Sequence, residues 1–435
     1  MRHNGGMASP KRRVAILGST GSIGTQALEV IAANPDRFEV VALAAGSNAA
    51  LLAEQVAATG ARMVGIADAA AAGELHAALS AGTALSAGAA PPEEAAQRAE
   101  VLTGDEAAVH IAAESGADVV LNGMTGSIGL RPTLAALRSG ATLALANKES
   151  LVVGGALVAQ ELQRPGQLVP VDSEHSALAQ ALSAGRHERG LCSLPAPGAS
   201  ELSGASEVSK LIVTASGGPF RGWHAAALAE VTPAQALKHP NYAMGRVVTT
   251  NSATMVNKAL EVIEAHLLFD IGLESIETVV HPQQWIHSMV QFRDGSTIAQ
   301  AGHPRMLIPI ALGLSWPERL SAVDVPIDWT QAMQWDFEPL DEQAFPAVAL
   351  AKQASAASPT HMAVYNAANE QAVGAFHEGR LSFPGIVSTI SDVLERYDPG
   401  HAAGSISLDE VLGAEDWARN TADGLIAAAK VQVRA

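Results

Sequence analysis

Two carboxylates separated by one residue follow a short apolar run near the middle of the chain. They are Asp172 and Glu174, in the sequence Pro170-Val-Asp-Ser-Glu-His-Ser176. In an extended segment, residues two apart point to the same face, so both carboxylates would face one way. Two acidic side chains beside a buried strand need a cation or a proton between them, and hard oxygen ligands suit Mg²⁺ or Mn²⁺. The alternative for such a pair is the solvated start of a loop.

A second polar cluster lies on a predicted amphipathic helix over residues 253–269. Apolar residues recur there at helical spacing, and a different face of the helix is polar. The polar residues are Ser252 at the N-cap, Asn257, Lys258 and Glu261. In the functional interpretation the first three hold a phosphate and Glu261 is a third metal ligand. In the alternative interpretation they form only a capped helix with an internal Lys–Glu pair.

Three further polar segments are candidates for the same ligand site. Residues 214–220 follow a predicted strand and contain Gly217 and Gly218, whose accessible backbone N–H groups suit a phosphate. Residues 238–246 form a polar loop that is either a lid over a ligand or a surface connection. Lys148 and Glu149 follow a strand at the edge where α/β sheets bind ligands, and they form either a surface ion pair or a substrate clamp.

A glycine-rich turn joins the first predicted strand to the first predicted helix. Gly18, Gly21 and Gly24 follow the apolar run Val14–Leu17 in the spacing GxxGxxG. Glycines allow the backbone to approach a pyrophosphate, and the helix N-terminus offers free N–H groups, so the turn predicts dinucleotide binding. The alternative is a glycine-rich turn without a ligand. The second strand ends in Gly46, Ser47 and Asn48 without a carboxylate to repel a 2′-phosphate, which favours NADP.

The elements that must position these residues alternate between short apolar strands and helices, which predicts an α/β fold with a parallel sheet. We expect a Rossmann-like NADPH-binding domain over residues 11–171. A catalytic α+β domain with an open sheet is expected over 172–303, and it includes a hairpin turn at 293–296. The proline-rich stretch 304–345 is expected to be a linker, and 346–435 a C-terminal helical domain.

The composition excludes several classes of function. The chain has 435 residues, with 27 Lys and Arg against 44 Asp and Glu, so its net charge is −17. Such a surface repels nucleic acid and anionic membranes, and any phosphate site must be built locally. The single cysteine, Cys192, fits a reducing cytoplasm. The N-terminus lacks the apolar core of a signal peptide, and no apolar run is long enough to span a membrane.

Eight ordered motifs together resemble the 1-deoxy-D-xylulose 5-phosphate reductoisomerase family over about residues 11–430. They are GSTGSIG, ANKES, PVDSEHS, TASGGPF, KHPNYAMGR, SATMVNKALEVIEA, HPQQWIHSMV and YNAANE. The resemblance implies a cytoplasmic homodimer that needs NADPH and Mg²⁺, Mn²⁺ or Co²⁺. It implies rearrangement and reduction of 1-deoxy-D-xylulose 5-phosphate to 2-C-methyl-D-erythritol 4-phosphate, the committed step of non-mevalonate isoprenoid biosynthesis. A retro-aldol route and an α-ketol shift both remain open.

The resemblance also implies residue roles. The expected metal ligands are Asp172, Glu174 and Glu261. The expected phosphate contacts are Ser216, Ser252, Asn257 and Lys258. Contacts to the sugar backbone are Lys148, Ser173 and His239, and His287 is either a further site residue or a satisfied strand histidine. The expected cofactor contacts are Thr20, Gly21, Ser22, Ile23, Gly46, Ser47, Asn48, Asn147, Glu149 and Gly245. Lys148, Glu174, His239 and Glu261 are the expected catalytic residues.

Some positions depart from the family pattern. Ser47 stands where a basic residue is common, which weakens the expected preference for NADPH over NADH, and Tyr242 stands where the lid often has Trp. Asn251 replaces a common Asp, and the stretch from Arg186 to Lys210 is longer than expected. Two other functions stay open at this point: an NADP-dependent sugar-phosphate or semialdehyde dehydrogenase without rearrangement, and a catalytically silent NADP-binding module.

Overall fold

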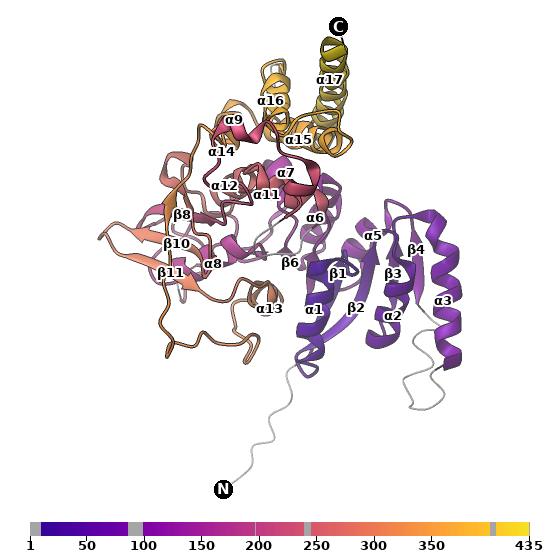
Figure 1. Ribbon diagram of the computed structural model, residues 1–435. Coiled ribbons are helices and arrows are strands. Elements are labelled where there is room, and N and C mark those ends of the chain that lie inside the picture. The colour runs from indigo at the N-terminus through magenta and orange to yellow at the C-terminus, as the bar shows by residue number, and fades with distance from the viewer. Residues whose placement is uncertain (1–9, 86–98, 196, 239–244, 401–405, 435) are drawn as a thin grey trace. The chain divides into compact units, whose positions relative to one another are not determined.

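The computed structural model describes residues 10–85, 99–195, 197–238, 245–400 and 406–434. Its internal contacts divide the chain into two units, which we describe separately (Figure 1). The first unit comprises Met1–Asn147, Leu162–Val171 and Met306–Val323. The second comprises Lys148–Glu161, Asp172–Arg305 and Asp324–Ala435. The four-part division expected from the sequence remains a proposal.

The first unit contains a seven-stranded sheet in the order β4-β3-β2-β1-β5-β6-β7, and every neighbouring pair is parallel. Its strands are β1 (Arg12–Leu17), β2 (Phe38–Ala45), β3 (Met63–Ile66), β4 (Glu100–Thr103), β5 (Val119–Asn122), β6 (Thr142–Leu145) and β7 (Leu168–Pro170). The chain moves outward from β1 to β4 and then returns to β5 on the other side of β1. The carboxyl ends of β1 and β5 therefore form a topological switch point, where such folds bind their ligands. The predicted Rossmann-like parallel sheet is confirmed.

Helices cover both faces of this sheet, as four consecutive buried residues in β1, Val14 to Leu17, require. The helices are α1 (Ser22–Ala32), α2 (Ala49–Thr59), α3 (Ala72–Leu85), α5 (Ala107–Glu114), α6 (Leu130–Arg138) and α13 (Leu307–Ser315). Helix α13 lies inside the stretch expected to be a linker. It joins the core because Ile310 and Leu314 are fully buried, and Gly313 approaches so closely that an added Cβ would lie 2.7 Å from Val171.

The second unit is built on a five-stranded sheet in the order β11-β10-β8-β9-β12. Only β8 and β9 run parallel, so the expected α+β character is present. The strands are β8 (Val208–Ala215), β9 (Ile276–Val280), β10 (Ile286–Phe292), β11 (Thr297–Ala301) and β12 (Glu338–Pro339). The helices nearest in sequence to the candidate residues are α7 (Lys148–Glu161), α8 (Ser173–Leu182), α9 (Ala225–Leu228), α10 (Pro233–Ala236), α11 (Arg246–Ala253) and α12 (Val256–Phe269).

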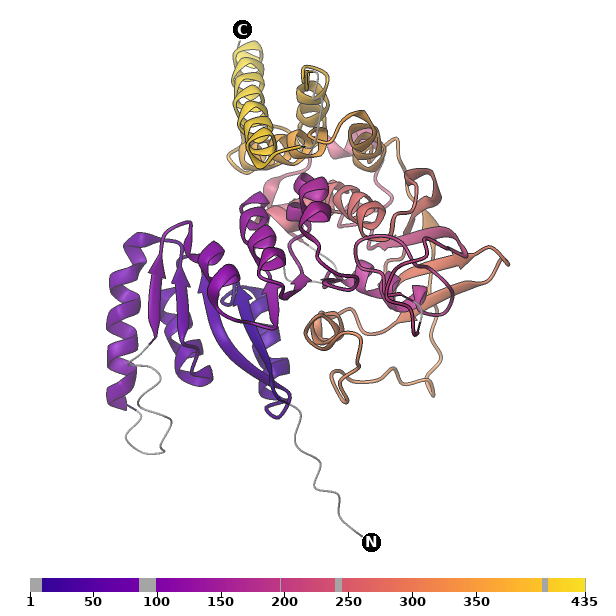
Figure 2. The same cartoon turned by 180° about the vertical axis from the view of Figure 1, so that it is seen from behind.

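The C-terminal part of the second unit is helical, as expected. It contains α14 (Ala347–Ala357), α15 (His361–His377), α16 (Phe383–Leu394) and α17 (Leu408–Arg434). Helices α15, α16 and α17 lie together in both views (Figure 1 and Figure 2). Among the described residues, no helix combines the length and the apolar character that crossing a membrane requires.

The predicted helix over 253–269 is α12, which begins three residues later than predicted, at Val256. Met255 adopts a left-handed backbone with φ of 64°, which ends the preceding turn and separates α11 from α12. A methionine has no intrinsic preference for this conformation, so local sequence gives no signal for the break. Ser252 consequently lies near the end of α11, and its predicted N-cap position is wrong.

Candidate metal, phosphate and nucleotide sites

Three carboxylates converge in the second unit. Asp172 is the N-cap residue of α8, Glu174 lies in the first turn of α8, and Glu261 comes from α12. One oxygen of each carboxylate lies within 4.8 Å of those of the other two. The extended segment predicted for Asp172 and Glu174 is wrong, because a helix begins between them. The predicted convergence of the three carboxylates is nevertheless present.

Two lysines lie between these carboxylates: Lys258 is buried, and the Lys148 side chain is 12% exposed. Lys148 Nζ is 2.5 Å from Asp172 Oδ2 and 2.7 Å from Glu261 Oε1. Lys258 Nζ is 2.6 Å from Glu174 Oε1, and it also contacts Glu261. Lys148 is therefore not part of a surface ion pair with Glu149. The predicted pair within α12, between Lys258 and Glu261, does form. Each lysine touches two carboxylates, so the cluster holds its charges in alternation.

The electrostatics of the cluster keep these lysines charged. Burial alone would lower the pKa of Lys148, but Asp172 and Glu261 outweigh it and raise that pKa well above its ordinary value. The pKa of Lys258 is raised for the same reason, with Glu174 as the leading carboxylate. Burial alone would raise the pKa of Glu174, yet the facing Lys258 brings it below its ordinary value. Glu174 is thus held as a carboxylate.

The donor set fits a hard divalent cation. Two carboxylates from the start of α8 and one from α12 share one small space, and oxygen donors of this kind suit Mg²⁺, Mn²⁺ or Co²⁺. Buried carboxylates at this distance repel one another unless cations separate them. In the structure two ammonium groups meet that need. The same oxygens can therefore bind a metal ion once the lysines yield their contacts.

The residues predicted to hold a phosphate fall into two pairs. Gly217 and Gly218 have φ of 82° and 65°, and the Gly218 N–H donates to Ser216 Oγ at 3.1 Å. A Cβ added to Gly218 would lie 2.9 Å from the Ser252 carbonyl oxygen, so this turn rests directly on Ser252. Asn257 accepts a bond from Lys148 Nζ at 3.0 Å and also contacts Glu261. Asn257 and Lys258 therefore belong to the acidic cluster itself.

Among the remaining predicted substrate residues, Ser173 and His287 each make a hydrogen bond in the structure. Ser173 Oγ donates to Glu174 Oε2 at 2.6 Å, so it supports a predicted metal ligand. His287 is buried in β10 with Nε2 3.1 Å from the His303 carbonyl, which agrees with a satisfied strand histidine. His239 and Tyr242 lie outside the described residues. Gly245 is the N-cap residue of α11.

The glycine-rich turn of the first unit has the geometry expected of a nucleotide site. Gly18 has φ of 82°, and an added Cβ would lie 2.8 Å from the Gly123 carbonyl oxygen. A Cβ on Gly24 would lie 2.4 Å from the Gly18 carbonyl oxygen, so both positions require glycine. Gly21 is the N-cap residue of α1 and, having no side chain, makes no capping hydrogen bond to the helix end. The N–H groups at this end are available to an anion.

The other predicted cofactor residues lie at strand ends. Gly46, Ser47 and Asn48 are exposed after β2, and Asn48 accepts a bond from Leu51 N as the cap of α2. The Ser19 N–H donates to the Ala44 carbonyl, which ties the glycine-rich turn to β2. Asn147 is buried and donates to the Met124 and Gly126 carbonyls. Glu149 belongs to the second unit, where burial raises its pKa.

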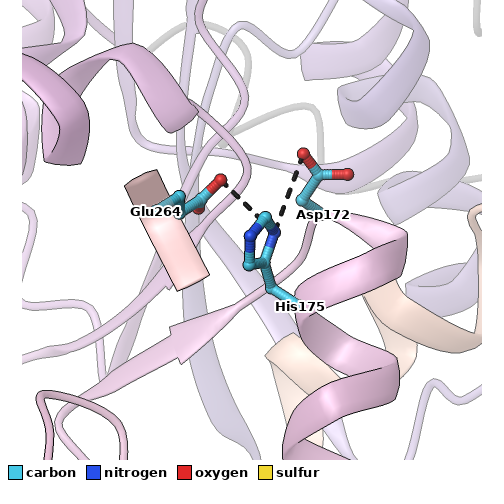
Figure 3. Close-up of side chains that lie close together, drawn as sticks. All are labelled: Asp172, His175 and Glu264. Atoms are coloured by element: carbon cyan, nitrogen blue, oxygen red, sulfur yellow. Dashed lines mark ion pairs between the residues drawn. The ribbon is translucent and has the colours of Figure 1, made fainter. Parts of the chain in front are cut away.

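Two buried residues of the cluster received no role from the sequence. His175 follows Glu174 on α8, and Glu264 lies on α12 one turn beyond Glu261; Figure 3 shows them facing each other beside Asp172. Glu264 would have been found from helical spacing, because residues 257, 261 and 264 share one face of a helix. A histidine beside two carboxylates is too common a pattern to assign without the structure.

A parallel sheet with a glycine-rich turn and a cluster of carboxylates that could hold a metal ion are features of dinucleotide-dependent oxidoreductases that use a metal. Family models give the particular family. The model described as 1-deoxy-D-xylulose 5-phosphate reductoisomerase matches residues 14–155, and that of its C-terminal domain matches 168–269. A third, described as the DXP reductoisomerase C-terminal domain, matches 301–421. The chain belongs to the 1-deoxy-D-xylulose 5-phosphate reductoisomerase family.

Curated relatives and solved structures agree with this assignment. The 1-deoxy-D-xylulose 5-phosphate reductoisomerase of Beutenbergia cavernae is 54% identical over 417 residues, which span 96% of this chain and 98% of that protein. The Mycobacterium marinum protein of the same name is 54% identical over 427 residues, spanning 98% and 95%. The Zymomonas mobilis enzyme in complex with NADPH is 38% identical, with a TM-score of 0.80 and coverage of 96% and 99%.

A further solved structure shows a family member with several ligands. It is a DOX-P reductoisomerase in complex with NADPH, fosmidomycin and magnesium, and it is 31% identical to this chain. Its TM-score is 0.82, with coverage of 96% of this chain and 99% of that one. The family predicted from the eight motifs and the predicted enzyme class are confirmed: the chain is an NADPH-dependent oxidoreductase and isomerase.

Proposed function

We propose that Asp172, Glu174 and Glu261 hold the divalent metal with which this enzyme converts 1-deoxy-D-xylulose 5-phosphate into 2-C-methyl-D-erythritol 4-phosphate, using NADPH. One observation carries the residue assignment: three carboxylate oxygens from α8 and α12 lie within 4.8 Å of one another in a buried cluster. When bound there, Mg²⁺, Mn²⁺ or Co²⁺ supplies Lewis acidity toward a carbonyl and a neighbouring hydroxyl. The magnesium complexes of related structures support this use of the cluster.

The residues around the cluster orient the substrate. Lys148 is charged and sits at the carboxylates, where it can hydrogen-bond the substrate oxygens that the carboxylates face. Lys258 and Asn257, with Ser216 and Ser252 on the neighbouring turn, bind the phosphate, which fixes the sugar and helps to exclude water. Ser173 and His239 are proposed to contact the sugar backbone.

The nucleotide is proposed to bind at the switch point of the parallel sheet. The open N-terminus of α1 would receive the pyrophosphate, because its N–H groups and helix dipole favour an anion. The exposed residues after β2 would surround the 2′-phosphate. The full proposed set is Thr20, Gly21, Ser22, Ile23, Gly46, Ser47, Asn48, Asn147, Glu149 and Gly245.

We also propose a homodimer that works in the cytoplasm. The dimer is supported by a segment, here called the exposed apolar patch, whose side chains Val325, Trp329, Met333 and Phe337 are individually exposed. Val325 and Trp329 are 62% and 67% exposed, and monomers seldom leave several large apolar side chains so accessible in one segment. The net charge of −17 argues against nucleic acid or anionic membranes as partners, and the substrate phosphate must be bound against it by local cations such as Lys258.

The experiment that tests the function follows NADPH absorbance with 1-deoxy-D-xylulose 5-phosphate and Mn²⁺, with and without excess EDTA. We expect decay that depends on the metal, with 2-C-methyl-D-erythritol 4-phosphate as the product. Decay that survives EDTA would reject the metal assignment and favour a dehydrogenase without rearrangement. An NADPH-binding protein without any decay would instead be the silent module.

The variant Glu261→Gln tests the ligand assignment directly. We expect Mn²⁺ affinity and turnover to fall at least about tenfold, because a metal ligand is lost. NADPH affinity should stay within about twofold of the unsubstituted enzyme, because the glycine-rich turn belongs to the other unit. Turnover above about a tenth of the original would reject Glu261 as a ligand.

A further inference from the structure

His175 and Glu264 form a buried pair behind the three carboxylates. His175 is 0% exposed and Glu264 is 1% exposed, and they come from α8 and α12 respectively. Figure 3 shows the imidazole between the Glu264 and Asp172 carboxyl groups. Neither residue has a part in the proposed reaction, although burying two ionisable groups is costly unless they are paired.

Both nitrogens of the His175 ring face α12. Nε2 lies 2.8 Å from the backbone carbonyl oxygen of Glu261, and Nδ1 lies 3.3 Å from Glu264 Oε2. A carbonyl oxygen can only accept, so Nε2 carries a hydrogen and donates it. In a neutral imidazole Nδ1 is then an acceptor, and it needs a donor.

Glu264 is the group that can supply this donor. The other carboxylate facing Nδ1 is Asp172, whose Oδ2 is 4.0 Å away and is held 2.5 Å from Lys148 Nζ. Because Asp172 is already paired with Lys148, the Glu264 carboxyl group, 3.3 Å from Nδ1, is the group placed to share a proton with it. Within the described residues neither Nδ1 nor Oε2 completes another hydrogen bond. A small rotation of the carboxyl group would let its O–H donate to Nδ1.

We propose that Glu264 and His175 are positioning residues that form a hydrogen-bonded brace between α8 and α12. The ring sits on α8 beside Asp172 and Glu174, and both of its nitrogens bind α12, which carries Glu261. The brace thereby fixes the two ligands of one helix against the third ligand of the other. This inference rests on the proposed metal ligands, and its direct consequence is metal affinity. Groups that orient metal ligands in this way commonly change metal affinity by about 10- to 100-fold.

The test measures Mn²⁺ binding to the metal-stripped full-length chain by isothermal titration calorimetry. Glu264→Leu removes the donor while keeping an apolar side chain of similar size, and we expect affinity about 10- to 100-fold weaker. Glu264→Gln keeps an N–H donor for Nδ1, so we expect affinity within about threefold of the original. Glu415→Leu, at a buried glutamate of α17, is the matched control and should leave Mn²⁺ affinity unchanged.

Nitrogen NMR of the His175 ring gives a second readout that does not depend on metal. The brace predicts a protonated Nε2 and a hydrogen-bonded Nδ1, a signature that Glu264→Gln keeps and Glu264→Leu alters. If Glu264→Leu fails to fold, the brace can still be tested. The protonation of the two ring nitrogens is then measured in the unsubstituted chain and in Glu264→Gln. A ring protonated on Nδ1 alone would overturn the brace.

The binding outcomes separate the brace from the ligand assignment. Wild-type Mn²⁺ affinity in Glu264→Leu would overturn the brace, and so would a Glu264→Gln variant as weak as Glu264→Leu. Two ions per chain, with the second lost in Glu264→Leu, would overturn it too, because Asp172, His175 and Glu264 would then bind metal themselves. If the unsubstituted chain binds no Mn²⁺, or if Glu261→Gln binds it normally, the proposed ligands fail instead.

Discussion

Lys258 is a buried cation, and its removal tests whether the carboxylates of the cluster need a compensating positive charge. It is 4% exposed and contacts Glu174 and Glu261. Lys258→Met leaves Glu174 without its cation and Glu261 with Lys148 alone, so we expect the metal-stripped protein to lose about 3–5 kcal/mol of its free energy of unfolding. Saturating Mn²⁺ should restore most of that loss, because the ion replaces the missing charge. Urea unfolding with and without Mn²⁺ measures both effects.

The control for this prediction is Lys210→Met. Lys210 pairs with Glu277 on the surface, where its side chain is 41% exposed. An exposed pair contributes about 1 kcal/mol or less, so this variant should unfold almost as the original does. A Lys258→Met protein as stable as the Lys210→Met protein would mean that the buried carboxylates need no compensating cation.

The chemistry of individual residues was more predictable than their surroundings. Residue type and spacing singled out Asp172, Glu174 and Glu261, and the structure brings all three together. Local sequence could not reveal that Lys148, 113 residues before Glu261, would sit against it. Helical spacing could have singled out Glu264, but its pairing with His175 depends on which helices face each other.

At the level of elements, His187 and Cys192 of the segment 186–210 lie at the end of α12. His187 Nε2 donates to the Phe269 carbonyl at 2.8 Å, and the Cys192 N–H donates to the Leu268 carbonyl at 3.4 Å. These carbonyls lie in the last turn of the helix, where no intrahelical donor reaches them. The helix ends at Asp270 with φ of 48°. The segment whose role the sequence left open therefore caps the helix that carries Glu261.

This cap makes a prediction about His187. His187→Ala leaves the Phe269 carbonyl buried without its donor, and we expect a loss of about 1–3 kcal/mol in the free energy of unfolding. His187→Gln offers an N–H and should lose less. Chemical denaturation near neutral pH measures both values. An alanine variant as stable as the original would show that the segment does not cap α12 through this ring.

The same cap has a definite pH dependence. Burial lowers the pKa of His187 below its ordinary value. Its contribution is therefore fully present above the unfolded pKa of about 6.5 and is lost as pH falls through the lower folded pKa. The original chain should lose stability relative to His187→Gln in that window, since glutamine does not titrate. Denaturation curves of both proteins at neutral and acidic pH measure the difference.

Regular elements were predicted well where hydrophobic pattern alone determines them. The strands of the parallel sheet are short apolar runs buried on both faces, and most were recognised from that pattern. Helix α8 was missed because Asp172 and Glu174 were interpreted as extended. Helix α13 was missed because prolines surround it, and its burial depends on a close approach at Gly313. Strand β4 has two exposed and two partly buried residues, so its hydrophobic pattern is weak.

At the scale of the whole molecule, the exposed apolar patch predicts the oligomeric state. Sedimentation equilibrium should give twice the 44.7 kDa mass of one chain. The double variant Val325→Glu and Trp329→Glu places charges in the patch, and we expect it to shift the protein to a single chain.

The matched control is Ile128→Glu, because Ile128 is equally exposed at 69% but lies outside the patch. It should sediment like the original protein. A double variant that keeps the full assembly mass would place the interface elsewhere, and a single-chain mass for the unsubstituted protein would reject the homodimer.

The two lysines of the cluster also determine how ligands influence each other. Lys148 and Lys258 each form ion pairs with two carboxylates, and these carboxylates are the ones proposed to bind metal. A cation taken up by those carboxylates releases the ammonium groups toward an anion. By thermodynamic reciprocity, sugar phosphate must then strengthen metal binding by the same factor by which metal strengthens sugar-phosphate binding. A chain of net charge −17 thus acquires its affinity for an anion together with its affinity for a cation.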